Sequence, residues 1–249
     1  MTFKYGIDTL TLDTVIGISE GTIEGILTED VKNKVIACRK KVEVMASSNR
    51  AIYGINTGFG PLCDVQITNE QTNKLQENLL ITHAVGVGNP IDKKLSKLMM
   101  ICKVHALCQG YSGIRLKVIE RILFFIENNL LPLVPEQGSV GASGDLAPLS
   151  HLFLPLIGEG EFLIDNQIVV AKKVLEDYGL KPIQLKAKEG LALINGTQFI
   201  LAHAITGLKK MEYLLDLADV AGAMSIEGYQ GSSSPFRDEL HQLRPFKGN

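Results

Sequence analysis

The most constraining feature of this sequence is a long apolar segment with helical periodicity towards its C-terminal end. From about residue 195 to residue 229 the pattern predicts one helix that is mostly apolar and contains Gly207 and Gly222. A helix that is apolar around its circumference has no side suited to water, so other helices have to enclose it. The sequence therefore predicts a mainly α-helical fold.

Part of this segment also resembles a membrane span by composition. Residues 190–208, GLALINGTQFILAHAITGL, contain no Asp, Glu, Lys or Arg. The polar residues 195–198 in the middle argue against a span, because each polar group in lipid needs an internal partner. We expect a buried protein helix and no membrane. The N-terminus, MTFKYGIDTLTLD, lacks the apolar core of a signal peptide, so we expect a cytoplasmic location.

Further helices are predicted from their caps. Thr28 precedes two acidic residues, and Thr68 with Gln71 forms a capping-box pattern. The stretch 161–170, EFLIDNQIVV, alternates around a central Asp-Asn pair and is the only segment expected to form strands, as a small hairpin. The basic run at 39–41 is interpreted as a solvated helix face. The expected helices are 28–46, 68–83 with a stop near Gly86, 92–109 ending at Gly110, and 114–129.

The charge balance and the cysteines exclude several classes of protein. The 249 residues include 25 Lys and Arg against 27 Asp and Glu, a formal net charge of -2. This balance does not indicate a basic face that would bind nucleic acid or an anionic membrane. We therefore expect a small molecule or another protein chain as the partner. The sequence contains no Cys-X-X-Cys pair and no zinc-like group of cysteines and histidines, so we expect neither disulfides nor a structural metal. The four cysteines are therefore expected to be reduced thiols: Cys38, Cys63, Cys102 and Cys108.

The glycine-rich stretch GSVGASGDLAPLSH, residues 138–151, is the strongest candidate for a reactive loop. Its serine, Ser143, can belong to a flexible linker, cap the helix that is expected to start at Asp145, or be a reactive group. A serine-hydrolase elbow is excluded because Asp145 stands where the second glycine of Gly-X-Ser-X-Gly belongs. The glycine-rich stretches at 86–90 and 58–62 satisfy neither a phosphate loop nor a dinucleotide fingerprint.

The backbone of this loop can itself react. In Ala142-Ser143-Gly144 the middle residue carries a leaving hydroxyl, and the glycine offers the least hindered amide nitrogen. If the Gly144 nitrogen attacks the Ala142 carbonyl and two waters leave, Ser143 becomes part of an imidazolone ring with an exocyclic methylene. Such a ring is an electrophile that no ordinary side chain supplies.

Four motifs in order make the sequence recognisable. The loop at 138–151, YGINTGFGPL at 53–62, THAVGVG at 82–88 and KEGLALINGTQ at 188–198 together resemble the N-terminal half of the histidine and phenylalanine ammonia-lyase family. The resemblance implies a helical ammonia-lyase/aspartase-like fold and a homotetramer. It also implies a methylidene-imidazolone (MIO) cofactor formed from Ala142-Ser143-Gly144, with Asp145 assisting its formation.

The resemblance assigns roles to two further residues. Tyr53 matches the family's catalytic tyrosine, which removes the proton β to the substrate amine, a task that requires its pKa to be lowered from about 10 by positive potential. Taken alone, without the resemblance, Tyr53 is better interpreted as a tyrosine packed on a glycine-rich turn. Asn195 matches an asparagine near the MIO ring and the substrate carboxylate; taken alone, it can be a kink or cap.

His83 bears on the choice of substrate. Thr82-His83-Ala84 is closest to the Ser-His form of histidine-specific members, and an imidazole here can exchange a hydrogen bond with a substrate imidazole. A histidine in the core is the alternative, and related aminomutases acting on tyrosine also carry a histidine here. The remaining histidines match no family motif and are interpreted as structural: His105, His151, His203 and His241.

Together these observations predict a carbon-nitrogen lyase that, in complete form, converts L-histidine to trans-urocanate and ammonia, as in histidine catabolism. Residues 1–249 are expected to be the MIO-bearing N-terminal portion, cut after the long helix and lacking the C-terminal part of the helical bundle. Two alternatives remain open: a truncated, catalytically silent module, and a tyrosine ammonia-lyase or aminomutase of the same family.

Overall fold

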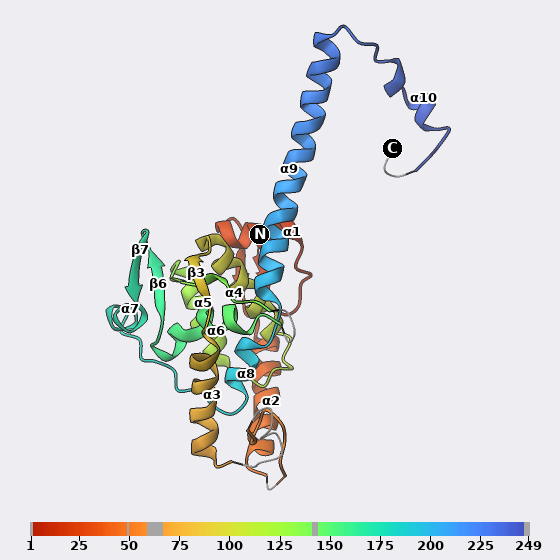
Figure 1. Ribbon diagram of the computed structural model, residues 1–249. Coiled ribbons are helices and arrows are strands. Elements are labelled where there is room, and N and C mark those ends of the chain that lie inside the picture. The colour runs from red at the N-terminus through yellow and green to blue at the C-terminus, as the bar shows by residue number, and fades with distance from the viewer. Residues whose placement is uncertain (1, 49, 59–66, 141–143, 247–249) are drawn as a thin grey trace. The chain divides into compact units, whose positions relative to one another are not determined.

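The computed structural model describes residues 2–48, 50–58, 67–140 and 144–246 of the chain (Figure 1). The chain divides into two compact units, Met1–Ala204 and Ile205–Asn249, which are described separately below. Helices make up most of the regular structure, as the sequence predicts. The helices that lie wholly within the first unit are α1 (Leu12–Glu20), α2 (Glu29–Ala46), α3 (Asn69–His83), α4 (Lys93–Leu107), α5 (Leu116–Glu127), α6 (Leu146–Phe153), α7 (Ala171–Asp177) and α8 (Glu189–Ile194).

The two helix starts predicted from Thr28 and from the Thr68–Gln71 pair are confirmed by cap hydrogen bonds. Thr28 accepts a hydrogen bond from the Val31 amide at the start of α2. Thr68 and Gln71 form both hydrogen bonds of a capping box at the start of α3. This helix ends at His83, before the predicted stop, with Ala84 rather than a glycine as its C-cap.

The predicted hairpin is present as β6 (Glu161–Ile164) and β7 (Gln167–Val170). Asp165 and Asn166 both have positive φ, 48° and 63°, which suits a tight two-residue turn. The expectation that this hairpin holds the only strands was wrong. The described residues contain five further strands of two to four residues, too short to produce an alternating pattern: β1 (Thr2–Lys4), β2 (Glu24–Ile26), β3 (Val87–Pro90), β4 (Leu131–Pro132) and β5 (Pro135–Gln137).

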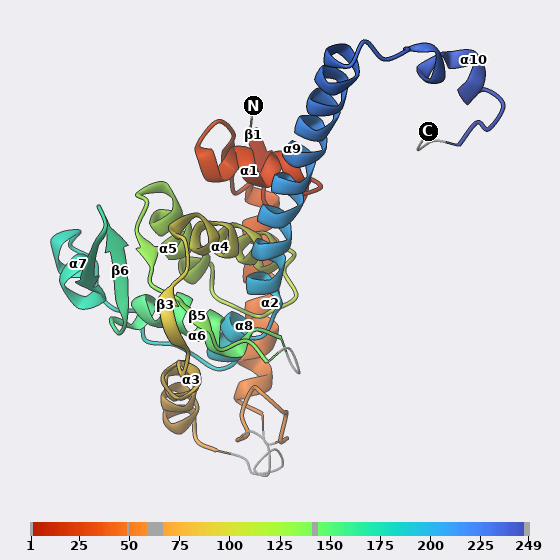
Figure 2. The same ribbon diagram turned by 45° about the horizontal axis from the view of Figure 1, so that its top comes forward.

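The core of the first unit is built around α4, which packs against α1 and α5 (Figure 2). Three consecutive residues of α4, Met99, Met100 and Ile101, are completely buried, so the helix is enclosed on more than the one face that its apolar stripe predicts. From α5, Ile119 and Ile122 are also completely buried. A short 3-10 helix follows α6 at Leu154–Ile157.

The interpretation of residues 39–41 as a solvated face was wrong for Arg39. Lys40 and Lys41 are exposed, but Arg39 is buried. Its guanidinium donates hydrogen bonds to the backbone carbonyls of Gly113 and Ala187, at 3.0 and 2.9 Å. Because a buried cation needs such partners, Arg39 is a structural link between distant segments.

The long predicted helix is α9 (Gln198–Gly228), and it begins three residues later than expected because Asn195 is extended and ends α8. Residues 189–228 are long and apolar enough to cross a membrane, and 22% of their most apolar 18-residue stretch is buried. Core helices of soluble proteins can have the same length and composition. In the second unit a 3-10 helix at Ser234–Phe236 and α10 (Asp238–His241) follow α9. The unit exposes many large apolar side chains, among them Leu208, Met211, Leu214, Leu215, Leu217, Val220 and Met224.

Candidate active site

The structure connects the four sequence motifs through contacts within the first unit. Strand β3, which follows His83, pairs antiparallel with β5, which precedes the loop at 138–151, so that Val87 lies opposite Gln137. Ile55 from the first motif shares an apolar cluster with Ala187, which directly precedes the fourth motif. These contacts join the second motif to the strand that precedes the loop, and the first motif to the segment that precedes the fourth.

Asp145 links this loop to the start of α9. The side chain is completely buried and accepts hydrogen bonds from the amides of Phe199 and Ile200, at 2.9 and 3.1 Å, in the first turn of the helix. It also accepts a hydrogen bond from the Ser139 hydroxyl at 2.6 Å. A carboxylate is well suited to this place because a helix N-terminus presents unpaired amides and positive potential.

Gly144 lies directly against the backbone of Gly196. Its φ is +94°, which favours glycine, and an added Cβ would lie 2.2 Å from the Gly196 carbonyl oxygen. The same carbonyl accepts a hydrogen bond from the Asp145 amide at 2.6 Å. The structure thus brings Gly144 and Asp145 together with the segment that contains Asn195. Ala142 and Ser143 lie outside the described residues.

Asn195 forms the C-cap of α8 and is exposed. Its backbone carbonyl accepts a hydrogen bond from Lys103 Nζ at 2.8 Å. The side chain of Lys103 reaches this carbonyl from the enclosed helix α4, and it was not among the residues that the sequence singled out.

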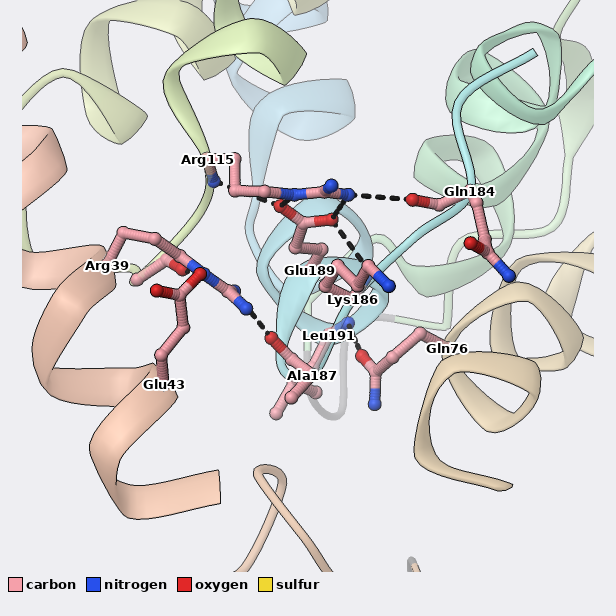
Figure 3. Close-up of polar contacts among 10 residues, drawn as sticks. Arg39, Glu43, Gln76, Arg115, Gln184, Lys186, Ala187, Glu189 and Leu191 are labelled. Carbon is pink, nitrogen blue, oxygen red and sulfur yellow. Dashed lines mark hydrogen bonds and ion pairs between the residues drawn. The ribbon is translucent and has the colours of Figure 1, made fainter. Parts of the chain in front are cut away.

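The N-terminal end of α8 is held by an ion pair between a buried glutamate and a partly exposed arginine (Figure 3). Glu189 is completely buried, and its carboxylate accepts hydrogen bonds from the Arg115 amide and guanidinium and from the Lys186 amide. Arg115 also donates to the Gln184 carbonyl. These bonds satisfy both carboxylate oxygens, as a charge without contact to water requires.

Two more side chains bind the backbone around α8. Gln76 on α3 accepts a hydrogen bond from the Leu191 amide at 3.2 Å, and Figure 3 shows it on the opposite side of α8 from Arg39. Arg39 binds the Ala187 carbonyl, as described above, while its Nε donates to Glu43. Helices α2 and α3 and the segment before α5 therefore all fix the helix that ends at Asn195.

His83 is partly buried at the end of α3. Its Nδ1 lies 2.8 Å from the Leu79 carbonyl and 3.4 Å from the Thr82 hydroxyl, so this ring nitrogen is engaged within its own helix. The following segment is attached to α6, because His151 Nε2 accepts a hydrogen bond from the Gly86 amide at 3.0 Å. Burial lowers the pKa of His151, which favours the neutral ring that this bond requires.

Tyr53 lies in a turn and is 59% exposed. The described residues contain no group of three or more His, Cys, Asp and Glu side chains arranged to hold a metal ion. Cys38, Cys102 and Cys108 are free thiols, whereas Cys63 lies outside the described residues.

Comparisons with known proteins agree with this architecture. The family model of aromatic amino acid lyases matches residues 10–249. The histidine ammonia-lyase of Myxococcus xanthus is 44% identical over 243 residues, which cover 97% of this chain and 47% of that protein. The chain therefore spans about half the length of this relative.

Several solved structures cover the whole chain, among them the following two. The histidine ammonia-lyase of Trypanosoma cruzi superposes with a TM-score of 0.91 at 36% identity, over 49% of that protein. The tyrosine aminomutase of Streptomyces globisporus superposes with a TM-score of 0.92 at 32% identity, over 47% of that protein. The chain belongs to the aromatic amino acid lyase family, and its fold is the one shared by these ammonia-lyases and aminomutases.

Two glutamates that both pair with arginine make a matched test of the support around α8. Glu189→Gln should lower the free energy of unfolding by about 3–5 kcal/mol, because it leaves the Arg115 charge without its buried partner. Glu43→Gln should cost less than about 1 kcal/mol, because Glu43 is more than half exposed where it pairs with Arg39. Urea unfolding of both variants measures the difference, and equal losses would contradict the assignment of Glu189 as the main support.

Proposed function

We propose that this chain is the N-terminal, MIO-bearing portion of a histidine ammonia-lyase, which eliminates ammonia from L-histidine to give trans-urocanate. The observation that carries the proposal is the contact of Gly144 and Asp145 with the Asn195–Gly196 segment. It joins the reactive tripeptide to the proposed substrate-binding asparagine. Membership of the aromatic amino acid lyase family supports the same reaction class.

The residues that the structure describes fit the proposed ring. Gly144 has a positive φ and no room for a Cβ, which suits a glycine nitrogen that closes a ring onto the Ala142 carbonyl. Asp145 is held beside it by three hydrogen bonds to its carboxylate. The MIO ring, once formed from Ala142, Ser143 and Gly144, supplies the electrophile through which the substrate amine leaves.

The remaining site residues have roles around the substrate. Tyr53 acts as the base that takes the proton β to the amine. Asn195 binds the substrate carboxylate beside the ring. His83 faces the substrate imidazole, and its Nε2 makes that contact while Nδ1 is engaged with the Leu79 carbonyl.

Two alternatives are each supported by one observation. The likeness to a tyrosine aminomutase supports a tyrosine ammonia-lyase or aminomutase. The chain spans about half the length of its Myxococcus xanthus relative, which supports a module without catalytic activity of its own. A direct test is to assay the 249-residue chain, and the same chain fused to the C-terminal half of the Myxococcus xanthus relative, with histidine, tyrosine and phenylalanine. Formation of urocanate by the fusion supports the proposal. Formation of β-tyrosine would instead indicate an aminomutase acting on tyrosine.

Ser143→Ala tests the electrophile. In the fusion, the variant should lose activity, and its intact mass should no longer show the loss of two waters that ring closure produces. Ser150→Ala is the matched control, because this buried hydroxyl has no hydrogen-bond partner in the described structure and should be dispensable. Normal turnover by Ser143→Ala would exclude the MIO assignment.

Tyr53→Phe tests the base. Removal of the hydroxyl should lower kcat of the fusion by a factor of about 100 or more while ring formation, read from intact mass, stays normal. Tyr111→Phe alters another exposed tyrosine and should leave kcat unchanged. A Tyr53→Phe variant with normal kcat would move the base to another residue.

His83→Leu tests the substrate. The change leaves a nitrogen of the substrate ring unpaired at a cost of about 1–3 kcal/mol, so histidine turnover should fall more than phenylalanine turnover. The measurement is the ratio of kcat/KM for the two amino acids. An unchanged ratio would place the specificity determinant elsewhere and leave tyrosine open as the natural substrate.

The exposed apolar side chains of the second unit predict association. We propose that the complete protein is a cytoplasmic homotetramer and that the 249-residue chain associates with itself, since burying apolar surface contributes about 25 cal/mol per Å². Light scattering measures the assembly state. A stable monomer would contradict this prediction. We also expect that the 249-residue chain alone releases no ammonia from L-histidine, and urocanate formed by it would contradict that expectation.

A further inference from the structure

Lys103 is a buried cation that neither the sequence motifs nor the proposed reaction uses. It lies in the last two turns of α4 and is 2% exposed. Its Nζ donates a hydrogen bond to the Asn195 carbonyl at 2.8 Å. Within the described part of the chain it forms no ion pair with a carboxylate.

This position is unfavourable for a lysine by itself. Burial lowers the pKa of Lys103 to about 7, which shows how poorly the site solvates the charge. An apolar side chain such as methionine would fill the same place in the core without that penalty. A reason for a lysine must therefore come from the group that its Nζ binds.

That group is the peptide between Asn195 and Gly196. Lys103 binds its carbonyl oxygen, while its nitrogen lies 3.1 Å from the position that a Cβ on Gly144 would occupy. The next carbonyl, that of Gly196, accepts the hydrogen bond from the Asp145 amide. One side chain from α4 thus fixes the backbone that is in contact with both Gly144 and Asp145.

The direction of the α8 helix dipole agrees with a cation placed at the Asn195 carbonyl. The Asn195 carbonyl follows the last turn of α8, where unpaired carbonyls attract a positive charge or a hydrogen-bond donor. Glu189 and Arg115 hold the other end of the same helix. Lys103 therefore completes the fixation of α8 at the end that enters the site.

We propose that Lys103 is a positioning residue that holds the Asn195–Gly196 peptide against Gly144 and Asp145 and so sets the direction of the Asn195 side chain. The positioning itself is independent of the reaction. Its consequence for ring closure and for substrate binding rests on the proposed function.

Amide hydrogen exchange of the 249-residue chain tests the positioning directly. Lys103→Met should raise the exchange rate of the Asp145 amide, which is bound to Gly196, by about tenfold relative to the amide of Ile122 in the core of α5. Lys97→Met is the control, since Lys97 lies on the same helix but binds Asn129. Lys103→Gln provides a second neutral side chain in case the methionine variant does not fold.

The outcomes separate positioning from general stabilisation. Faster exchange at Asp145 with unchanged Ile122 supports the proposal. Equal changes at both amides, no change at either, or loss of folding in both Lys103 variants would overturn it.

Intact mass of the same samples addresses the proposed function separately. If the wild-type chain loses two waters, the ring-closed fraction should fall at least about tenfold in Lys103→Met and stay normal in Lys97→Met. A wild-type chain that never loses two waters would count against the MIO assignment, while the exchange data would still decide the role of Lys103.

Discussion

The candidate site depends on the burial of the Glu189 carboxylate. It has no access to water, so it must be satisfied by the amides of Arg115 and Lys186 and by the Arg115 guanidinium. These bonds fix the start of α8, whose six residues are too few to form a stable helix alone. Since Asn195 ends α8, the position of the Asn195–Gly196 peptide, and with it the environment of Gly144, follows from this ion pair.

Local features of the fold could be predicted because their causes are local in the sequence. The capping box at Thr68 and the positive φ values of Asp165 and Asn166 each depend on residues within one turn. The pairing of Gly144 with the Asn195 segment was anticipated only through the family resemblance, since the contact joins residues about fifty positions apart. Very short strands such as β4 left no pattern to read.

Buried charges could not be predicted for the opposite reason. Arg39 and Lys103 stand in helices whose periodicity gives no sign of what their cationic groups bind. Arg39 stands in a run of basic residues, yet it binds carbonyls 74 and 148 positions away. Lys103 binds a carbonyl 92 positions away. Only the tertiary structure distinguishes such a cation from its exposed neighbours.

The hydrogen bonds of Asp145 also impose an order of events during synthesis. Its Oδ2 accepts hydrogen bonds from amides 54 and 55 positions further along the chain, and these two partners do not both exist until residue 200 has been made. The Gly196 carbonyl that binds its amide also comes late. On the ribosome, Asp145 therefore emerges before these partners, and its carboxylate forms both hydrogen bonds only after the start of α9 has left the exit tunnel.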